Sequence, residues 1–116
     1  MSRSGRWIAA AGALCAGLSV ALAAYASHGA EGLAQSRLQT AAAFAFGHGV
    51  ALALLAPAPA DGLRKVALGS LFAGMLLFSG SLAAGALLGW PTAAAPFGGS
   101  LMILGWLLLA AGYLRR

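Results

Sequence analysis

The sequence contains few charged residues, and this scarcity excludes most soluble folds. Charged side chains make up 8% of the 116 residues and hydrophobic side chains make up 61%, whereas an average soluble domain carries about 25% charged residues. Such a chain cannot cover a soluble globule with polar surface, and it is too apolar for a disordered segment. We therefore expect one integral membrane domain that spans residues 1–116.

Cysteine and acidic residues are also scarce, which excludes several kinds of functional site. The single cysteine, Cys15, cannot form an intramolecular disulfide or a multi-cysteine metal site. The two acidic residues, Glu31 and Asp61, fall on opposite sides of the expected membrane, so they cannot form a catalytic carboxylate pair. No glycine-rich phosphate loop follows a predicted strand. We expect no enzyme activity, no catalytic residue, no metal site and no cofactor.

Four apolar segments are long enough to cross a bilayer as helices. A hydrocarbon core of about 30 Å requires roughly 20 apolar residues, and suitable segments cover residues 7–25, 38–56, 66–88 and 97–113. Strand-like alternation does not occur, which disfavours a β-barrel. The sequence predicts an all-α bundle of four transmembrane helices, with a long polar connection or short interfacial helix over residues 26–37.

The positive charges predict the orientation of this bundle. Basic residues accumulate on the side that carries both termini and the middle loop, namely Arg3, Arg6, Arg64, Lys65, Arg115 and Arg116. Only Arg37 lies on the other side. Because basic loops stay in the cytoplasm, we expect both termini in the cytoplasm and the protein in a bacterial inner membrane. The charges form no basic stripe, so we expect no nucleic-acid partner.

The first segment has a second interpretation as a signal peptide. Arg3 and Arg6 precede an apolar stretch, and residues 24–26 resemble a cleavage site. That stretch has about 19 residues, which exceeds the roughly 7–15 residues of a signal-peptide core. We therefore expect the first segment to be retained as a transmembrane helix.

Small residues spaced by four predict where the helices approach closely. In lipid, helix association depends on such positions, because the surrounding chains are as apolar as leucine. We expect helix packing at Gly12, Gly47, Gly74, Gly85 and Gly89. The third helix has the densest set of small residues, and we expect it to be central.

Polar side chains are predicted to gather near the middle of the membrane. His48 lies ten residues inside the second segment, about 15 Å from its outer end at about 1.5 Å per residue. Counting from the same side gives a midplane polar layer of Cys15, His48, Ser79, Ser81 and Trp106. In one interpretation, neutral His48 bonds to Ser79 or Ser81 and shares the network with the Trp106 indole, which fixes helix register. In the other, the layer lines a cavity for a proton, a metal ion or a small ligand.

The remaining polar residues suggest weaker sites. His28 and His48 differ in predicted depth by more than about 10 Å, which argues against a haem held by both. Cys15 and His48 alone are a weak signal for copper. His28, Glu31 and Arg37 form a candidate outer cap in which Glu31 pairs with Arg37, and a solvated interfacial loop is the alternative.

Several stretches resemble the family catalogued as domain of unknown function 423. The residues that carry the resemblance are 26–29 with Gly32 and Leu33, then Thr40, Phe44 and His48, then 77–82, 96–99 and 103–106. The resemblance implies a four-helix inner-membrane protein, and it implies no particular activity or cofactor. The sequence departs from the family pattern at residues 42–47, which are nearly apolar, and at Gln39, where an acidic residue is common.

Two functions are compatible with this sequence. The first is a non-enzymatic scaffold or accessory subunit, in contact with the lipid bilayer and with another membrane protein or a second copy of itself. The second is a pathway or binding protein for a small molecule, a lipid or a proton, which would use the polar layer around His48.

Overall fold

The protein consists of four long α-helices. The computed structural model describes residues 2–115, in which the helices are α1 (Arg3–Gly29), α2 (Gly32–Leu55), α3 (Gly62–Leu88) and α4 (Ala95–Leu114). All four are long and apolar enough to cross a membrane. The predicted all-α fold with four candidate spans is therefore confirmed.

Local signals explain where several helices begin and end. The Ser2 side chain accepts a hydrogen bond from the Gly5 amide at the start of α1 (3.0 Å), and Asp61 accepts one from Arg64 at the start of α3 (2.9 Å). Both residues satisfy an amide that the first helical turn leaves without a partner. Gly89 ends α3 with φ +70°, a left-handed conformation that glycine adopts without steric cost.

The connection predicted over residues 26–37 is helical along most of its length. α1 continues to Gly29 and α2 begins at Gly32, so only Ala30 and Glu31 link them. The Gln35 side chain donates to the Ala26 carbonyl at 2.9 Å and satisfies one acceptor in the last turn of α1. Apolar runs mark the hydrocarbon-spanning part of a helix, whereas backbone hydrogen bonding extends through its polar ends.

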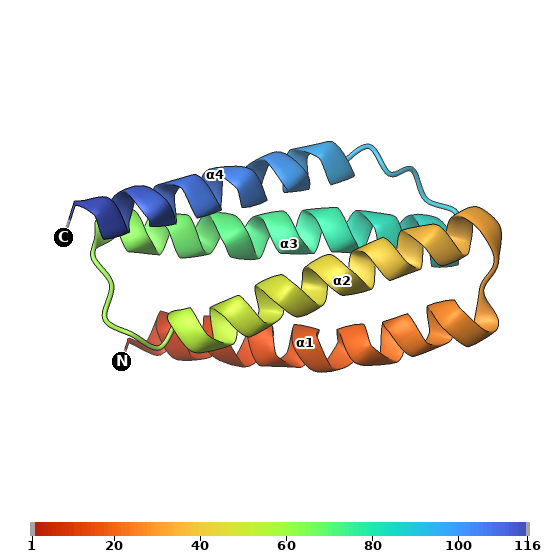
Figure 1. Cartoon of the computed structure of the whole chain (residues 1–116), viewed down its shortest axis with the longest axis horizontal. Coiled ribbons are helices and arrows are strands. Elements are labelled where there is room, and N and C mark those ends of the chain that lie inside the picture. Colours follow the sequence, from red (N-terminus) through yellow and green to blue (C-terminus); the bar gives the residue numbers. More distant parts are fainter. Residues whose placement is uncertain (1, 116) are drawn as a thin grey trace.

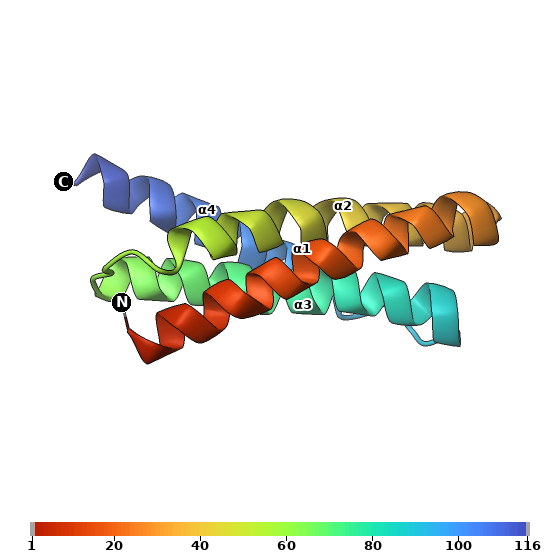
Figure 2. The same ribbon diagram turned by 90° about the horizontal axis from the view of Figure 1, so that it is seen from below.

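The helices lie roughly antiparallel to their neighbours along the chain (Figure 1). The main contacts join α1 to α2, α2 to α3 and α3 to α4, so α2 and α3 share the central position predicted for the third helix alone. Seen from below, α1 runs obliquely across α3 (Figure 2). Leu52, Ala56, Leu68, Leu71, Met75 and Met102 form the buried core. The arrangement is two helical hairpins joined through α2 and α3.

Both ends of the described chain lie at the same end of the molecule as the connection between α2 and α3 (Figure 1). Five of the six basic residues predicted to share one side are found there, and Arg116 lies outside the described residues. The long dimension is 46 Å, close to the roughly 40–45 Å of a bilayer with its headgroups. The molecule therefore has one strongly basic end.

Exposed aromatic residues mark both ends of the apolar region. Trp7 and Tyr113 are exposed near the basic end, and Tyr25 and Trp90 are exposed near the opposite end. Along α1, Trp7 and Tyr25 are separated by about 27 Å at about 1.5 Å per residue. This separation agrees with the thickness of a hydrocarbon core, at whose two interfaces tryptophan and tyrosine are enriched.

Glycines set the closest helix approaches within each hairpin. A Cβ atom on Gly12 of α1 would lie 2.7 Å from the Gly49 carbonyl oxygen of α2, and a Cβ on Gly49 would lie 2.5 Å from the Gly12 oxygen. Gly74 of α3 and Gly98 of α4 have the same reciprocal relation, at 2.7 Å each. Any side chain at these four positions would push two backbones apart.

The other predicted packing glycines have different surroundings. A Cβ on Gly47 would have no heavy atom within 4 Å, so the close approach on α2 occurs at Gly49 instead. Gly85 lies beneath Thr92 of the α3–α4 loop, and Gly89 ends its helix. Small residues spaced by four mark candidate packing positions on a helix, but the spacing does not show which side of that helix a neighbouring helix occupies.

Candidate functional site

His48 is held by hydrogen bonds at both ring nitrogens. The Trp106 indole Nε1 donates to His48 Nε2 at 2.9 Å, and His48 Nδ1 lies 2.9 Å from the Phe44 carbonyl oxygen. An indole N–H can only donate, so Nε2 accepts and Nδ1 carries the hydrogen that Phe44 receives. This pairing defines a neutral imidazole with one tautomer, and it joins α2 to α4.

Aromatic rings surround this pair. The His48 and Trp106 ring centroids are 5.7 Å apart in an edge-on arrangement, and Phe44 packs edge-on against Phe78 at 4.9 Å. Ala43, Phe44, Gly47, His48 and Trp106 line a shallow depression of about 310 Å³. Because both imidazole nitrogens are engaged within the protein, this depression offers a ligand few polar groups.

The other members of the predicted midplane layer lie elsewhere. The Ser79 hydroxyl donates to the Ala41 carbonyl at 2.9 Å, which links α3 to α2. Ala41 precedes His48 by seven residues, or about 10 Å along α2. The Ser81 hydroxyl is buried and has no hydrogen-bond partner among residues 2–115. Neither serine bonds to His48, so the predicted histidine–serine network is not formed.

Cys15 lies near the depth of His48 but on a different face. A Cβ on Gly49, the neighbour of His48, would lie 3.0 Å from the backbone nitrogen of Ala16. Yet the Cys15 side chain contacts the buried core and lines a groove between α1 and α3. Counting residues from a helix end gives depth, whereas the face depends on helix rotation at 3.6 residues per turn.

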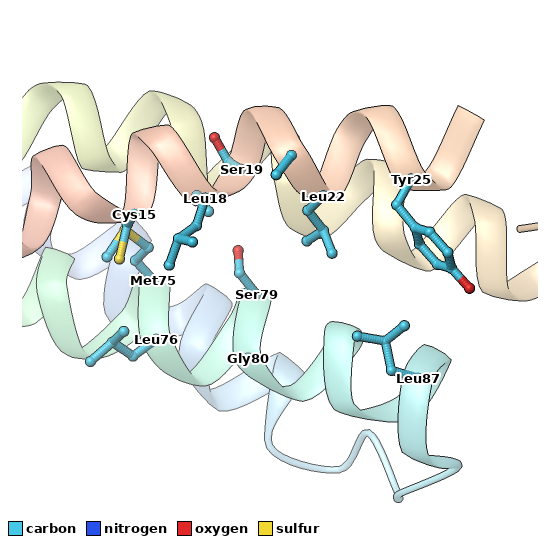
Figure 3. Close-up of a pocket in the computed structure, with 12 residues that line it drawn as sticks. Cys15, Leu18, Ser19, Leu22, Tyr25, Met75, Leu76, Ser79, Gly80 and Leu87 are labelled. Carbon is cyan, nitrogen blue, oxygen red and sulfur yellow. The ribbon is translucent and has the colours of Figure 1, made fainter. Parts of the chain in front are cut away.

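This α1/α3 groove is larger than the depression beside His48. It has a volume of about 530 Å³, and α1 and α3 diverge towards the end that carries Tyr25 and Leu87 (Figure 3). Cys15, Leu18 and Leu22 point from α1 towards α3 in the same view. The full lining consists of Cys15, Leu18, Ser19, Ala21, Leu22, Tyr25, Ala45, Met75, Leu76, Ser79, Gly80 and Leu87.

The groove is almost entirely apolar, and both of its serine hydroxyls are engaged with backbone carbonyls. Ser19 donates to Ala16 at 2.6 Å and Ser79 donates to Ala41. Apart from the Cys15 and Met75 sulfur atoms and the Tyr25 phenol, the lining therefore presents hydrocarbon and backbone to whatever lies between α1 and α3. Such a surface suits an apolar helix or a lipid chain and gives no orientation to a polar substrate.

The predicted outer cap does not form as an ion pair. Among the described residues, Glu31 and Arg37 are not within ion-pair distance, and a guanidinium nitrogen of Arg37 reaches α3 beside Gly85. His28 lies in the last turn of α1, where a polar side chain near the helix C-terminus is common. These three residues lie at the end opposite the basic one without sharing a site.

Arg64 at the basic end has a role that the sequence did not predict. It is 7% exposed, and its Nη2 donates to the carbonyl of Leu55, the last residue of α2, at 3.1 Å. A guanidinium at this position donates to a carbonyl that has no partner within the helix, and its positive charge interacts favourably with the negative end of the helix dipole. Asp61 pairs with Arg115 at 2.9 Å and so connects α3 to α4. The count of basic residues used Arg64 and Arg115 only to predict orientation.

The fold defines a multi-pass membrane protein with four candidate spans. Within residues 2–115, no three side chains of histidine, cysteine, aspartate or glutamate gather closely enough to hold a metal ion. Comparison with protein families matches residues 22–99, from α1 into α4, to the family described as "Protein of unknown function (DUF423)". The chain belongs to this family, which confirms the resemblance. Comparison with curated proteins and with solved structures gave no match.

Proposed function

We propose that the protein is a non-enzymatic scaffold or accessory subunit of a membrane complex, in which it binds an apolar transmembrane helix of a partner. The observation that carries this proposal is the α1/α3 groove, which leaves one side of the hairpin pair without a helix. The partner is a second membrane protein or a second copy of this chain.

The dimensions and lining of the groove support a helix as its occupant. From Cys15 to Tyr25 the groove follows α1 for about 15 Å, or about three helical turns. Ala21, Ala45 and Gly80 are small residues in its lining, and small residues allow helix backbones to approach closely in lipid. α1 is also the least buried of the four helices. A further helix in the groove would give α1 the packing that α2 and α3 already have.

The state of His48 supports a structural role over a transport pathway. Its two nitrogens are bonded to Trp106 and Phe44, so a proton or ligand would have to break one of these bonds first. The pair instead fixes the register of α2 against α4, as intramembrane hydrogen bonds commonly do.

The distribution of charge supports a cytoplasmic position for the basic end, in a bacterial inner membrane. Five described basic residues lie at that end, and Arg37 is the one at the other end. Short basic loops remain on the cytoplasmic side during insertion.

The proposal is tested by filling the groove. Gly80 lines it, and a Cβ at this position has no heavy atom within 4 Å, so the backbone accepts a side chain here and Gly80→Leu occupies space between α1 and α3. Gly69→Leu is the matched control, because Gly69 lies on the same helix with equally open surroundings and does not line the groove. Each full-length protein is extracted gently from its own membranes and analysed by native mass spectrometry.

We expect the wild type and Gly69→Leu to retain a partner chain or a second copy. In Gly80→Leu the ratio of complex to free chain should fall about tenfold, since overpacking of a helix contact costs about 1–3 kcal/mol. A wild-type protein that is always a free monomer would contradict the proposal. So would a complex that Gly80→Leu leaves unchanged.

A further inference from the structure

A separate cleft opens at the basic end of the molecule. It has a volume of about 340 Å³ and lies between the first turns of α1, the α2–α3 connection and the start of α3. Its lining includes two hydroxyl groups, Ser2 and Ser4, and one cation, Lys65. None of its residues lines the α1/α3 groove, so the two features are independent.

The charges around this cleft are not balanced within the protein. Asp61 pairs with Arg115, and Arg64 is buried against the end of α2. Arg3, Arg6 and Lys65 are exposed, and none of them has an ion-pair partner among residues 2–115. Of these three cations Lys65 lines the cleft, where an external anion can neutralise it, and Arg3 and Arg6 add positive charge to the same end of the molecule.

The position and polarity of the cleft match those of a lipid headgroup. Trp7, which marks the interface on α1, lies in sequence between the lining residues Gly5 and Ile8. Ser2, Ser4 and Lys65 lie towards the water, whereas Ile8 and Leu68 lie about one turn further into the membrane on α1 and α3. A phospholipid has the same order, with a charged phosphate above and hydrocarbon below.

We propose that this cleft binds the headgroup of an anionic phospholipid from the leaflet at the basic end. The Lys65 ammonium group pairs with the phosphate. The Ser2 and Ser4 hydroxyl oxygens lie 3.4 Å apart, so one hydroxyl donates to the other and the second hydroxyl hydrogen is free for a phosphate oxygen. The glycerol backbone and the start of the acyl chains contact Ile8 and Leu68. The unpaired charge of Arg3 and Arg6 favours an anionic headgroup over a zwitterionic one.

The test measures lipid binding to the full-length protein in detergent by native mass spectrometry. The probes are phosphatidylglycerol and phosphatidylcholine, added in increasing amounts. We expect the wild type to prefer phosphatidylglycerol and Lys65→Gln to bind it about fivefold more weakly, as loss of one lysine near a membrane surface implies. Lys65→Arg should retain binding. Ala58→Leu keeps every charge but fills the cleft, since Ala58 is an exposed lining residue, and it should also weaken binding.

Arg37→Gln is the matched control, because it removes one positive charge at the opposite end of the molecule. It should leave phosphatidylglycerol binding unchanged. Equal weakening by Arg37→Gln and Lys65→Gln would show an effect of net charge and would overturn the proposal. Equal affinity of the wild type for the two lipids would overturn it as well, and so would full phosphatidylglycerol binding by Lys65→Gln or Ala58→Leu.

Discussion

At the scale of single residues, the most informative feature is the pair formed by His48 and Trp106. A histidine inside a membrane helix is costly unless its nitrogens are satisfied, and here the indole and the Phe44 carbonyl satisfy both. His48 is 8% exposed, while Trp106 remains 41% exposed to its surroundings. The bond therefore lies at the edge of the contact between α2 and α4.

Trp106→Phe should reduce the free energy of unfolding by about 0.6–2 kcal/mol, the range of intramembrane side-chain hydrogen bonds. The change removes the donor to His48 Nε2 and retains an aromatic ring. The measurement is unfolding by sodium dodecyl sulfate in mixed micelles, followed by circular dichroism. Trp90→Phe is the control, because Trp90 is exposed within the α3–α4 loop. An equal loss in both variants would mean that the bond to His48 contributes nothing.

The sequence predicted part of this site. The depth of His48 and Trp106 followed from residue counts, because helical rise is constant. The contacts of Ser79 and Ser81 did not follow, because a count along α3 gives depth and does not give the helix rotation that turns Ser79 towards Ala41 instead of His48. The sequence places Arg64 shortly after the turn that follows α2, close to the end of that helix. It does not show that the guanidinium donates to the Leu55 carbonyl, because that contact depends on the tertiary structure.

At the scale of helices, the glycine contacts determine how closely each hairpin packs. Gly12 and Gly49 place the backbones of α1 and α2 in contact, and Gly74 with Gly98 does the same for α3 and α4. Ser70 strengthens the second hairpin, because its hydroxyl donates to the Leu101 carbonyl at 2.6 Å. Backbone proximity lets dispersion and polar contacts replace the hydrophobic effect, which does not drive association in lipid.

Gly49→Ala and Gly47→Ala form a matched pair on α2. A Cβ on Gly49 would meet backbone atoms of both Gly12 and Ala16, so α1 and α2 must separate at a cost of about 1–3 kcal/mol. Gly47 faces open space, so its replacement should not destabilise the protein, and the higher helix propensity of alanine should raise the free energy of unfolding by up to about 1 kcal/mol. Detergent unfolding of both variants gives the comparison. Equal destabilisation would show that the Gly12–Gly49 approach is not tight in the membrane.

At the scale of the whole molecule, sequence predicted the number and identity of the helices. Apolar length is a direct consequence of bilayer thickness, and it located all four helices. It did not predict that α2 and α3 share the centre or that α1 leaves a groove beside α3. Those features depend on helix rotation and crossing, which an alanine-rich sequence encodes only through a few glycines.

The proposed orientation gives a prediction for the intact chain. Fusion of green fluorescent protein to the C-terminus should give a fluorescent product, and fusion of alkaline phosphatase at the same point should be inactive, because that enzyme requires the periplasm. A phosphatase inserted between Ala30 and Glu31 should be active. The reverse pattern would place the basic end outside and contradict the proposed topology.

The two-residue link between α1 and α2 also bears on the order of biosynthesis. Once Leu55 has been synthesised, the first hairpin already contains its Gly12–Gly49 approach and the bond from Gln35 to Ala26. The second hairpin likewise contains its own glycine approach. Each half can therefore pack within the bilayer without the other, so that the first hairpin can form while the second is still being synthesised.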